Sequence, residues 1–287
     1  MTISRPGSAR DRLARALDTT TGWTRLGLRT AIYAGTSSTV GAVVPGPHLS
    51  QWLFARWCRA TVRQLGVTLD AAGLEAARDA APCILAANHL SALDIPVLGA
   101  VLEGDYRWVA KRELFRVPFV GWHLWSAGHI PVDRRAGRKA AVSLQARVER
   151  VLAEGASVLL FPEGTRSADG ALQRFKLGAF QAAVRAGVPL VPIVLDGTQA
   201  IVRKGAFALD PSAPRTVVVR GLAPVPYDQG LARARPDEAA KALRGATFAR
   251  FVKVLDDLRG VEGAALAPFP PPGTAQSPGV AAPTGAR

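Results

Sequence analysis

The sequence predicts an α/β fold: a mostly parallel sheet flanked by helices, with an N-terminal helical region before it. Short apolar runs alternate with helical patterns through the middle of the chain, as in proteins whose parallel strands are joined by helices. A composition of 48% hydrophobic and 20% charged residues over 287 residues is typical of a globular protein. Polar motifs follow several apolar runs, where such sheets bind ligands.

The expected strands are short apolar runs, and the expected helices carry apolar residues at helical spacing. We predict strands at residues 82–87, 106–110, 129–132, 157–161, 189–195 and 216–220. We predict helices at residues 96–102, 138–153, 178–186 and 237–258.

Composition also changes at both ends of the chain. Residues 1–20 are polar and basic, and residues 263–287 are rich in Pro, Gly and Ala, so this tail is expected to be disordered. Between them we expect a membrane-associating helical region at 21–70 and the α/β domain at 71–262.

The charge balance indicates anionic partners. There are 36 Lys and Arg residues against 22 Asp and Glu, a formal net charge of +14, which suits nucleic acid, an acidic lipid surface or a phosphorylated substrate. No nucleic-acid-binding signature is found, so nucleic acid is not expected. Cys58 and Cys83 have no metal-ligand spacing, and we expect neither a metal nor a disulfide framework. The first 20 residues lack the apolar core of a secretory signal.

The stretch NHLSALD, residues 88–94, follows the apolar run PCILAA. A chain leaving the sheet here can bring the His89 imidazole beside the Asp94 carboxylate. A carboxylate at one ring nitrogen selects the tautomer and stabilises the imidazolium that forms at the other. The stretch therefore indicates a general base with its orienting partner.

Two alternatives use the same residues. Ser91 and Asp94 fit the Ser/Thr-x-x-Asp/Glu capping box that starts many helices, although Pro96 would move the start of the helix toward Asp94 or Ile95. Ser91 as a nucleophile would make the protein a serine hydrolase. Against this, there is no G-x-S-x-G elbow, and a serine two residues from its base is poorly placed.

Two more motifs suit an anionic ligand. In FPEGTRS, residues 161–167, Gly164 allows a tight turn and Arg166 offers a planar fork for phosphate oxygens. Glu163 would hold a basic side chain or a substrate hydroxyl. The alternative is an ordinary turn with a surface arginine. The stretch KRELFRVPFVGWHLWSAGHIPVDR, residues 111–134, mixes a basic start with a Trp-rich interior, and we interpret its histidines as packing or surface residues.

The motifs NHLSALD, KRELFRVPFVGW, FPEGTRS and VPIV, in this order over about residues 80–200, resemble the 1-acylglycerol-3-phosphate acyltransferase (lysophosphatidate acyltransferase) family. The resemblance implies that His89 is the general base and Asp94 its partner. It assigns Glu163, Gly164, Thr165 and Arg166 to the glycerol phosphate of the substrate. It also implies that Lys111 belongs to the same phosphate site.

The activity implied by the resemblance is acyl transfer from acyl-CoA or acyl carrier protein to the sn-2 hydroxyl of 1-acylglycerol-3-phosphate, giving phosphatidate, without a cofactor. Relatives acylate other lysolipids such as lyso-ornithine lipid, and the motifs do not separate these acceptors. The chain length and the donor carrier are equally open.

Membrane access is expected from residues 49–65. Leu49, Trp52, Leu53 and Trp57 share one helical face beside arginines, a pattern suited to an anionic membrane surface. The alternative is that this face packs on the sheet. Residues 30–55 are uncharged but interrupted by PGP, so no spanning helix is predicted. We expect a peripheral or monotopic enzyme at the cytoplasmic face of the cell membrane.

Overall fold

A computed structural model describes residues 48–133, 137–206 and 209–267, with residues 24, 27–37 and 39 of an N-terminal helical part. The predicted basic segment 1–20 and most of the predicted tail lie outside the described residues. Residues 263–267 are described, and Ala265 is buried between a hydrogen bond to Asp256 and one from Leu172. The first residues of the predicted tail therefore pack on the domain.

Seven strands form one sheet in the order β1-β7-β6-β2-β5-β3-β4. The strands are β1 (Thr68–Ala72), β2 (Ile84–Ala87), β3 (Tyr106–Lys111), β4 (Ile130–Val132), β5 (Ser157–Leu160), β6 (Leu190–Asp196) and β7 (Thr216–Gly221). All neighbours pair in parallel except β6 and β7, which are antiparallel. The predicted mostly parallel sheet is confirmed.

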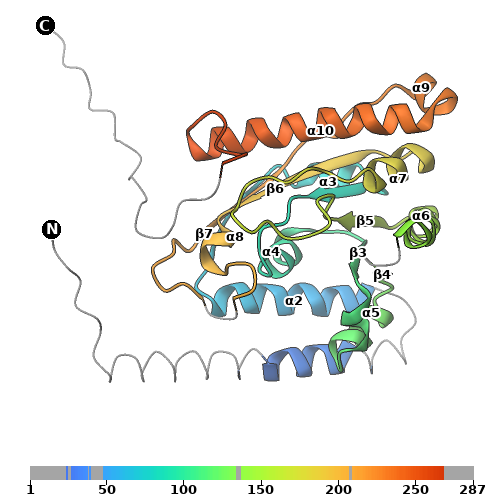
Figure 1. Cartoon of the computed structure of the whole chain (residues 1–287). Coiled ribbons are helices and arrows are strands. Elements are labelled where there is room, and N and C mark those ends of the chain that lie inside the picture. The colour runs from blue at the N-terminus through green and yellow to red at the C-terminus, as the bar shows by residue number, and fades with distance from the viewer. Residues whose placement is uncertain are drawn as a thin grey trace, which may run out of the picture.

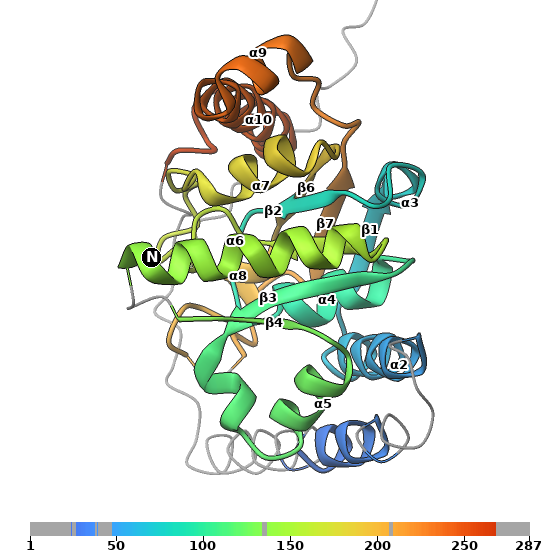
Figure 2. The ribbon, with the colours of Figure 1, turned by 90° about the vertical axis from the view of Figure 1, so that its right-hand side faces the viewer.

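Helices cover both faces of the sheet (Figures 1 and 2). They are α2 (His48–Gln64), α3 (Glu75–Asp79), α4 (Asp94–Val101), the 3-10 helix η1 (Arg112–Arg116), α5 (Val120–Ser126), α6 (Gly137–Ala153), α7 (Gly178–Ala186), α8 (Thr198–Ile201), α9 (Gln229–Ala234) and α10 (Pro236–Arg259). Helices α6, α7 and α10 pack on one face, and α2 and α4 on the other. The helical segment 27–37 lies beyond α2, farther from the sheet (Figure 1).

Alternating side chains of the central strands enter the two cores. Ile84 and Ala86 of β2 pack with α6, α7 and α10, whereas Leu85 and Ala87 pack with α4 on the opposite face. Because both faces are covered, β2 and β5 are buried throughout. This explains why they read as continuous apolar runs in the sequence.

The six predicted strands and four predicted helices are all present, with ends shifted by at most two residues. Strand β1 was not predicted, because its sequence TLDAA carries a charge and four of its five residues are exposed. The expected boundary at residues 70 and 71 falls inside this strand. Among the described residues, no helix combines the length and apolarity needed to cross a membrane.

The sheet topology brings distant segments together at one edge. Strands β2, β3, β5 and β6 run in the same direction, and β2 lies between β5 and β6. The segments that follow these strands therefore meet at their shared carboxyl edge, which is the usual ligand-binding edge of such sheets.

Candidate active site

His89 and Asp94 form a direct pair at the carboxyl end of β2. Nδ1 of His89 lies 2.7 Å from Oδ2 of Asp94, as the sequence predicted. The chain turns after β2 and enters α4 at Asp94, so the five-residue spacing returns the carboxylate to the imidazole. Asp94 is fully buried, and 9% of His89 is exposed.

Asp94 is fixed from several sides. Its Oδ2 also accepts hydrogen bonds from the backbone N–H groups of Leu90 (2.7 Å) and Ser91 (2.9 Å). Its Oδ1 accepts one from the Thr198 hydroxyl at 2.6 Å. Because a carboxylate surrounded by donors acts as an acceptor, the proton of a neutral His89 ring lies on Nδ1. Nε2 is then the basic nitrogen.

The geometry bears on both alternative roles for this stretch. Asp94 Oδ2 accepts the Ser91 N–H at 2.9 Å and Ser91 Oγ accepts the Leu93 N–H at 3.3 Å, so the two side chains bond the turn before α4 as a capping pair does, while Asp94 also holds His89. The Ser91 side chain is fully buried, and its hydroxyl donates to the Val202 carbonyl at 2.7 Å. A hydroxyl engaged in this way is not positioned as a nucleophile for His89.

Glu163 supports the backbone of the catalytic segment. Oε1 accepts the N–H of His89 at 2.6 Å, and Oε2 accepts the N–H of Gln173 at 3.1 Å. The residue is only 3% exposed, and burial raises the pKa of its carboxyl group to about 7. Both oxygens accept backbone N–H groups, so Glu163 holds the segment of His89 in place, and its contact with the substrate stays a prediction.

The segments after β2, β5 and β6 are connected to one another. The Ser167 N–H donates to the His89 carbonyl at 2.8 Å. The Asn88 side chain exchanges two hydrogen bonds with the backbone of Leu195, at 2.9 and 2.7 Å. Gly164 has a φ of +75°, a left-handed conformation that glycine adopts without strain. The tight turn predicted for FPEGTRS is present.

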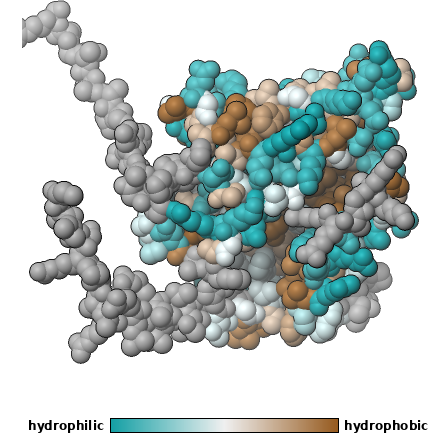
Figure 3. Space-filling view, in the orientation of Figure 1, coloured by the Kyte–Doolittle hydropathy of each residue, from teal (hydrophilic) through white to brown (hydrophobic). Residues whose placement is uncertain are grey.

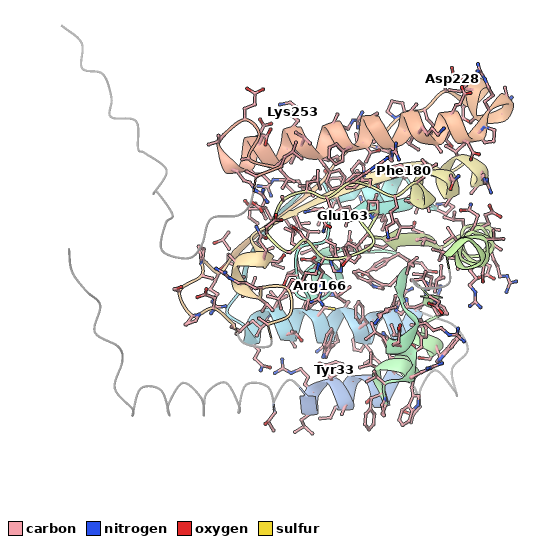
Figure 4. All side chains as sticks on the ribbon, in the orientation of Figure 1. Tyr33, Glu163, Arg166, Phe180, Asp228 and Lys253 are labelled. Atoms are coloured by element: carbon pink, nitrogen blue, oxygen red, sulfur yellow. The ribbon has the colours of Figure 1, made fainter. Side chains whose placement is uncertain are left out.

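A cavity of about 430 Å³ opens beside His89. Lys111, from the end of β3, and Arg166, from the segment after β5, also line it. Figure 4 shows Arg166 between Glu163 and the helical segment that carries Tyr33. The predicted base and two of the predicted phosphate ligands therefore share one cavity.

The remaining lining of this cavity is mostly apolar. Phe161 stacks on the His89 ring with 3.9 Å between ring centroids. The further apolar lining residues are Ala34, Phe54, Trp57, Ala92, Ile95, Val109, Ala110, Leu114, Val120 and Leu124. An apolar cavity that starts at a general base suits a hydrocarbon chain attached to a reactive group.

The cationic residues at the cavity are more exposed than the base. The Lys111 side chain is 47% exposed and lies 3.4 Å from a Glu113 oxygen. Lys204 donates to the backbone carbonyl of Arg166 at 2.7 Å, which adds a cation next to the predicted phosphate site. Thr165 is exposed, and its carbonyl accepts a hydrogen bond from Gln173.

In the fold, some residues of the helical face that was expected to meet a membrane are buried and others are exposed. Leu53 is buried against the domain, and Trp57 lines the cavity while its Nε1 donates to Thr30 at 3.1 Å. Trp52 remains 52% exposed, with the Arg56 guanidinium 4.9 Å from its ring centroid. Part of this face therefore packs inward, because segment 27–37 covers it.

Sequence reasoning missed three residues of the site. Thr198 follows β6 and bonds to Asp94, Phe161 follows β5 and stacks on His89, and Lys204 bonds to Arg166. Phe161 is the last residue of a predicted strand and Thr198 lies three residues after another, which was the only available signal. Nothing local marks Lys204, since the contact joins residues 38 positions apart.

An acyltransferase family model matches residues 69–196. A chloroplastic 1-acyl-sn-glycerol-3-phosphate acyltransferase of Brassica napus is 42% identical over 125 residues, covering 44% of this chain and 36% of that protein. The alpha enzyme of the same name from Ovis aries is 33% identical over 198 residues, covering 68% and 67%. The chain thus spans about a third of the length of that plant protein.

A solved structure has the same fold. It is the 1-acyl-sn-glycerophosphate acyltransferase PlsC of Thermotoga maritima, with a TM-score of 0.63 and 22% identity over 82% of this chain and 96% of that one. The fold of the chain, including the sheet that carries His89 and Asp94, is therefore that of a known acyltransferase structure.

Proposed function

Because the chain belongs to the 1-acylglycerol-3-phosphate acyltransferase family, we propose that it transfers a fatty acyl group to the sn-2 hydroxyl of 1-acylglycerol-3-phosphate, forming phosphatidate. The donor is acyl-CoA or acyl carrier protein. The observation that carries this proposal is the His89–Asp94 pair beside an apolar cavity that Lys111 and Arg166 also line.

In the proposed reaction, His89 is the general base. Its Nε2 takes the proton of the acceptor hydroxyl as the oxygen attacks the thioester carbonyl. The new C–O bond forms and the C–S bond breaks, and the imidazolium returns the proton to the departing thiolate. Asp94 stabilises the imidazolium through Nδ1, 2.7 Å away. General-base assistance of this kind contributes typically about 10²–10⁴-fold.

We assign the phosphate of the acceptor to Arg166 and Lys111. Arg166 offers paired N–H donors and Lys111 a single mobile charge. Both line the cavity that also contains His89, so an acceptor bound through its phosphate would keep its hydroxyl near the base. The acyl chain of the donor would occupy the apolar remainder of the cavity.

Access from a membrane would use an apolar face formed by segment 27–37 and the η1–α5 region. Its members are Leu28, Ile32, Leu114, Val117, Phe119, Trp122 and Trp125, each at least 40% exposed. Figure 3 has hydrophobic patches along this lower edge of the molecule. Exposed aromatic residues suit the headgroup region, and the exposed Arg112 and Arg116 suit anionic lipids. We therefore infer peripheral binding at the cytoplasmic face of the cell membrane.

The test is an acyl-transfer assay of the purified protein. Acyl-CoA and acyl carrier protein donors are offered with lysophosphatidate, other lysophospholipids and lyso-ornithine lipid, and the lipid products are identified by mass spectrometry. We expect phosphatidate, with lysophosphatidate preferred and His89→Ala as the inactive control. Preferential acylation of lyso-ornithine lipid, which lacks the glycerol phosphate, would overturn the acceptor assignment. A lack of transfer to every lysolipid would overturn the activity.

A further inference from the structure

A second cavity adjoins the cavity of His89 at Phe161. Its volume is about 600 Å³, and sites for small molecules typically measure about 300–1,000 Å³. Phe161 and Val109 line both this second cavity and the first, which contains His89. Because Phe161 stacks on the His89 ring, the second cavity begins at the side chain that contacts the base.

The two cavities lie on opposite faces of the sheet. The first is bordered by Phe54 and Trp57 of α2. The second is lined by residues of α6 and α7, including Val142, Gln145, Val148, Ala179, Gln181 and Ala182. Helices α6 and α7 pack on the face opposite α2. A ligand that occupies both cavities therefore crosses the carboxyl edge of β3 and β5 beside His89.

The lining of the second cavity combines polar and apolar side chains. The Gln145 amide donates to Glu149 at 2.8 Å and the Gln181 amide to Asp237 at 2.9 Å, which leaves their carbonyl oxygens as acceptors. Val142 also lines the cavity and is 66% exposed. A chain with amide and alkyl groups can donate to the glutamines and pack on the apolar wall. A pure hydrocarbon chain would use only the apolar wall.

Lys176 gives the second cavity an unpaired cation. The other charged lining residues are in ion pairs, since Arg185 lies 3.7 Å from Asp237 and Asp133 lies 3.7 Å from Arg112. Neither an ion pair nor a hydrogen bond is found between the exposed Lys176 amine and the residues that the structure describes. This amine can therefore bind an anionic group of a ligand.

Gly164 explains the position of the Lys176 side chain. A Cβ atom on residue 164 would lie 2.6 Å from Lys176 Nζ and 2.8 Å from its Cε, so the lysine occupies the space that a side chain there would fill. The Lys176 backbone N–H also donates to the Pro162 carbonyl at 2.8 Å. The FPEGTRS turn thus places Lys176 in the second cavity and Arg166 in the first.

We propose that the second cavity binds the phosphopantetheine arm of the acyl thioester donor, with the phosphate of the arm at Lys176. This inference rests on the proposed function and adds a binding site for the carrier portion of the donor. The thioester lies at His89, the acyl chain in the first cavity and the arm in the second. The two amides of the arm match the glutamines, and its phosphate matches the lysine. Coenzyme A and acyl carrier protein both carry this arm.

The first measurement isolates the phosphate of the arm. Acyl-phosphopantetheine and acyl-pantetheine of one chain length are compared as donors to lysophosphatidate. In the wild type, kcat/KM should be about threefold to tenfold higher for the phosphorylated donor, because an exposed amine contributes a modest charge-assisted bond. Lys176→Met keeps an unbranched side chain without the charge and should bring the ratio close to one. An unchanged ratio would overturn the phosphate assignment.

Arg174→Met is the matched control for this charge change. Arg174 is exposed two residues before Lys176 and is not among the residues that line either cavity. The variant loses the same charge from the same segment and should keep the wild-type ratio. If Arg174→Met lowers the ratio as much as Lys176→Met does, the preference reflects general surface charge, which would overturn a specific site at Lys176.

Michaelis constants identify the substrate that contacts Lys176. Lys176→Met should raise KM for acyl-CoA and for acyl carrier protein thioesters, and leave KM for lysophosphatidate as in the wild type. An increase for lysophosphatidate alone would assign the lysine to the acceptor and overturn the inference. An increase for only one of the two donors would place it against the nucleotide or the carrier protein, and would equally overturn the shared phosphopantetheine site.

A bulky side chain in the second cavity tests the path of the arm. Val142→Trp replaces an exposed lining residue and should lower kcat/KM several-fold for all pantetheine thioesters, because it fills the space of the arm. Ser143→Trp is the control, since Ser143 is the next residue of α6 and is exposed but does not line the cavity. Equal activity of the two variants would show that the arm lies elsewhere.

Binding without turnover separates this inference from the proposed function. An S-alkyl coenzyme A is a thioether that cannot transfer its chain, and calorimetric titration measures its affinity for the wild type and for Lys176→Met. Weaker binding to the variant supports the site even if the wild type acylates no lysolipid. Equal affinities alongside normal acyl transfer to lysophosphatidate would overturn the site and leave the proposed function intact.

Discussion

The cavity has two contrasting regions. At the reaction centre, Asp94 is fully buried and accepts four hydrogen bonds, from His89, Leu90, Ser91 and Thr198. At the cationic region, Lys111 is half exposed and pairs with Glu113 at 3.4 Å, and Arg166 is partly exposed. One region is held by buried hydrogen bonds within the protein, and the other lies nearer to solvent.

The contrast reflects what each region is proposed to do. A general base acts on an atom that must lie within about 3 Å, so its orientation has to be determined by the protein. A phosphate is a large anion, and long cationic side chains can adjust their conformation to bind it. Changes at the reaction centre should therefore reduce turnover more than changes at the cationic region.

The largest expected effect is at His89. His89→Ala should lower kcat at least about hundredfold, because the proton acceptor is lost, while circular dichroism shows an intact fold. Asp94→Asn should be severe but smaller, because the amide no longer selects the tautomer. Ser91→Ala should remain active within a few-fold. A folded His89→Ala protein with wild-type turnover would remove the base from the mechanism.

The next effect concerns the support of the reaction centre by Glu163. Burial raises its pKa to about 7 from an ordinary 4.5, so the folded protein retains a proton that the unfolded chain has lost. Its contribution to stability is thus fully present below pH 4.5 and is lost as the pH rises through 7. The change in the free energy of unfolding is at most about 3 kcal/mol.

Urea unfolding of the wild type and Glu163→Gln between pH 5 and 8 measures this change. As the pH rises, the free energy of unfolding of the wild type should fall relative to that of Glu163→Gln, because only the wild type has a carboxyl group that ionises. His123 and His129 have lowered pKa values and titrate in the opposite sense, but they are common to both proteins. Parallel stability curves would show that Glu163 is ionised throughout.

A smaller effect is expected at the cationic region. Arg166→Ala should lower kcat/KM for lysophosphatidate at least about tenfold, because charge-assisted hydrogen bonds are lost, and Arg166→Lys should lie between it and the wild type. Hydrolysis of acyl-CoA by water involves no phosphate acceptor and should change much less. Equal losses in both reactions would assign Arg166 to the fold or to the donor.

The smallest effect is expected at the apolar face. Trp122→Ser and Trp125→Ser together should weaken sedimentation with anionic vesicles several-fold, because exposed aromatic area is lost. Trp57→Ser is the matched comparison, since Trp57 faces the cavity and should affect turnover more than vesicle binding. If Trp57 changes vesicle binding more than the exposed pair does, the membrane-binding surface is on α2 as the sequence suggested.

The sequence by itself was sufficient wherever the relevant interactions are local. Covered strands require continuous apolar residues, so the central strands were predictable. His89 and Asp94 are five residues apart, and a single turn brings them together. Strand β1 could not be predicted from local sequence, because its pairing with β7, rather than its own composition, holds it at the edge of the sheet.

Only the tertiary structure decided the roles that depend on distant partners. Glu163 bonds to a backbone 74 residues away, and Thr198 to a carboxylate 104 residues away. Trp57 lines the cavity because segment 27–37 packs over α2. His123 and His129 were expected as packing or surface residues, and only the fold decides that both are buried, in the wall of the cavity. No local pattern encodes such contacts, because they arise where the sheet order brings separate segments to one edge.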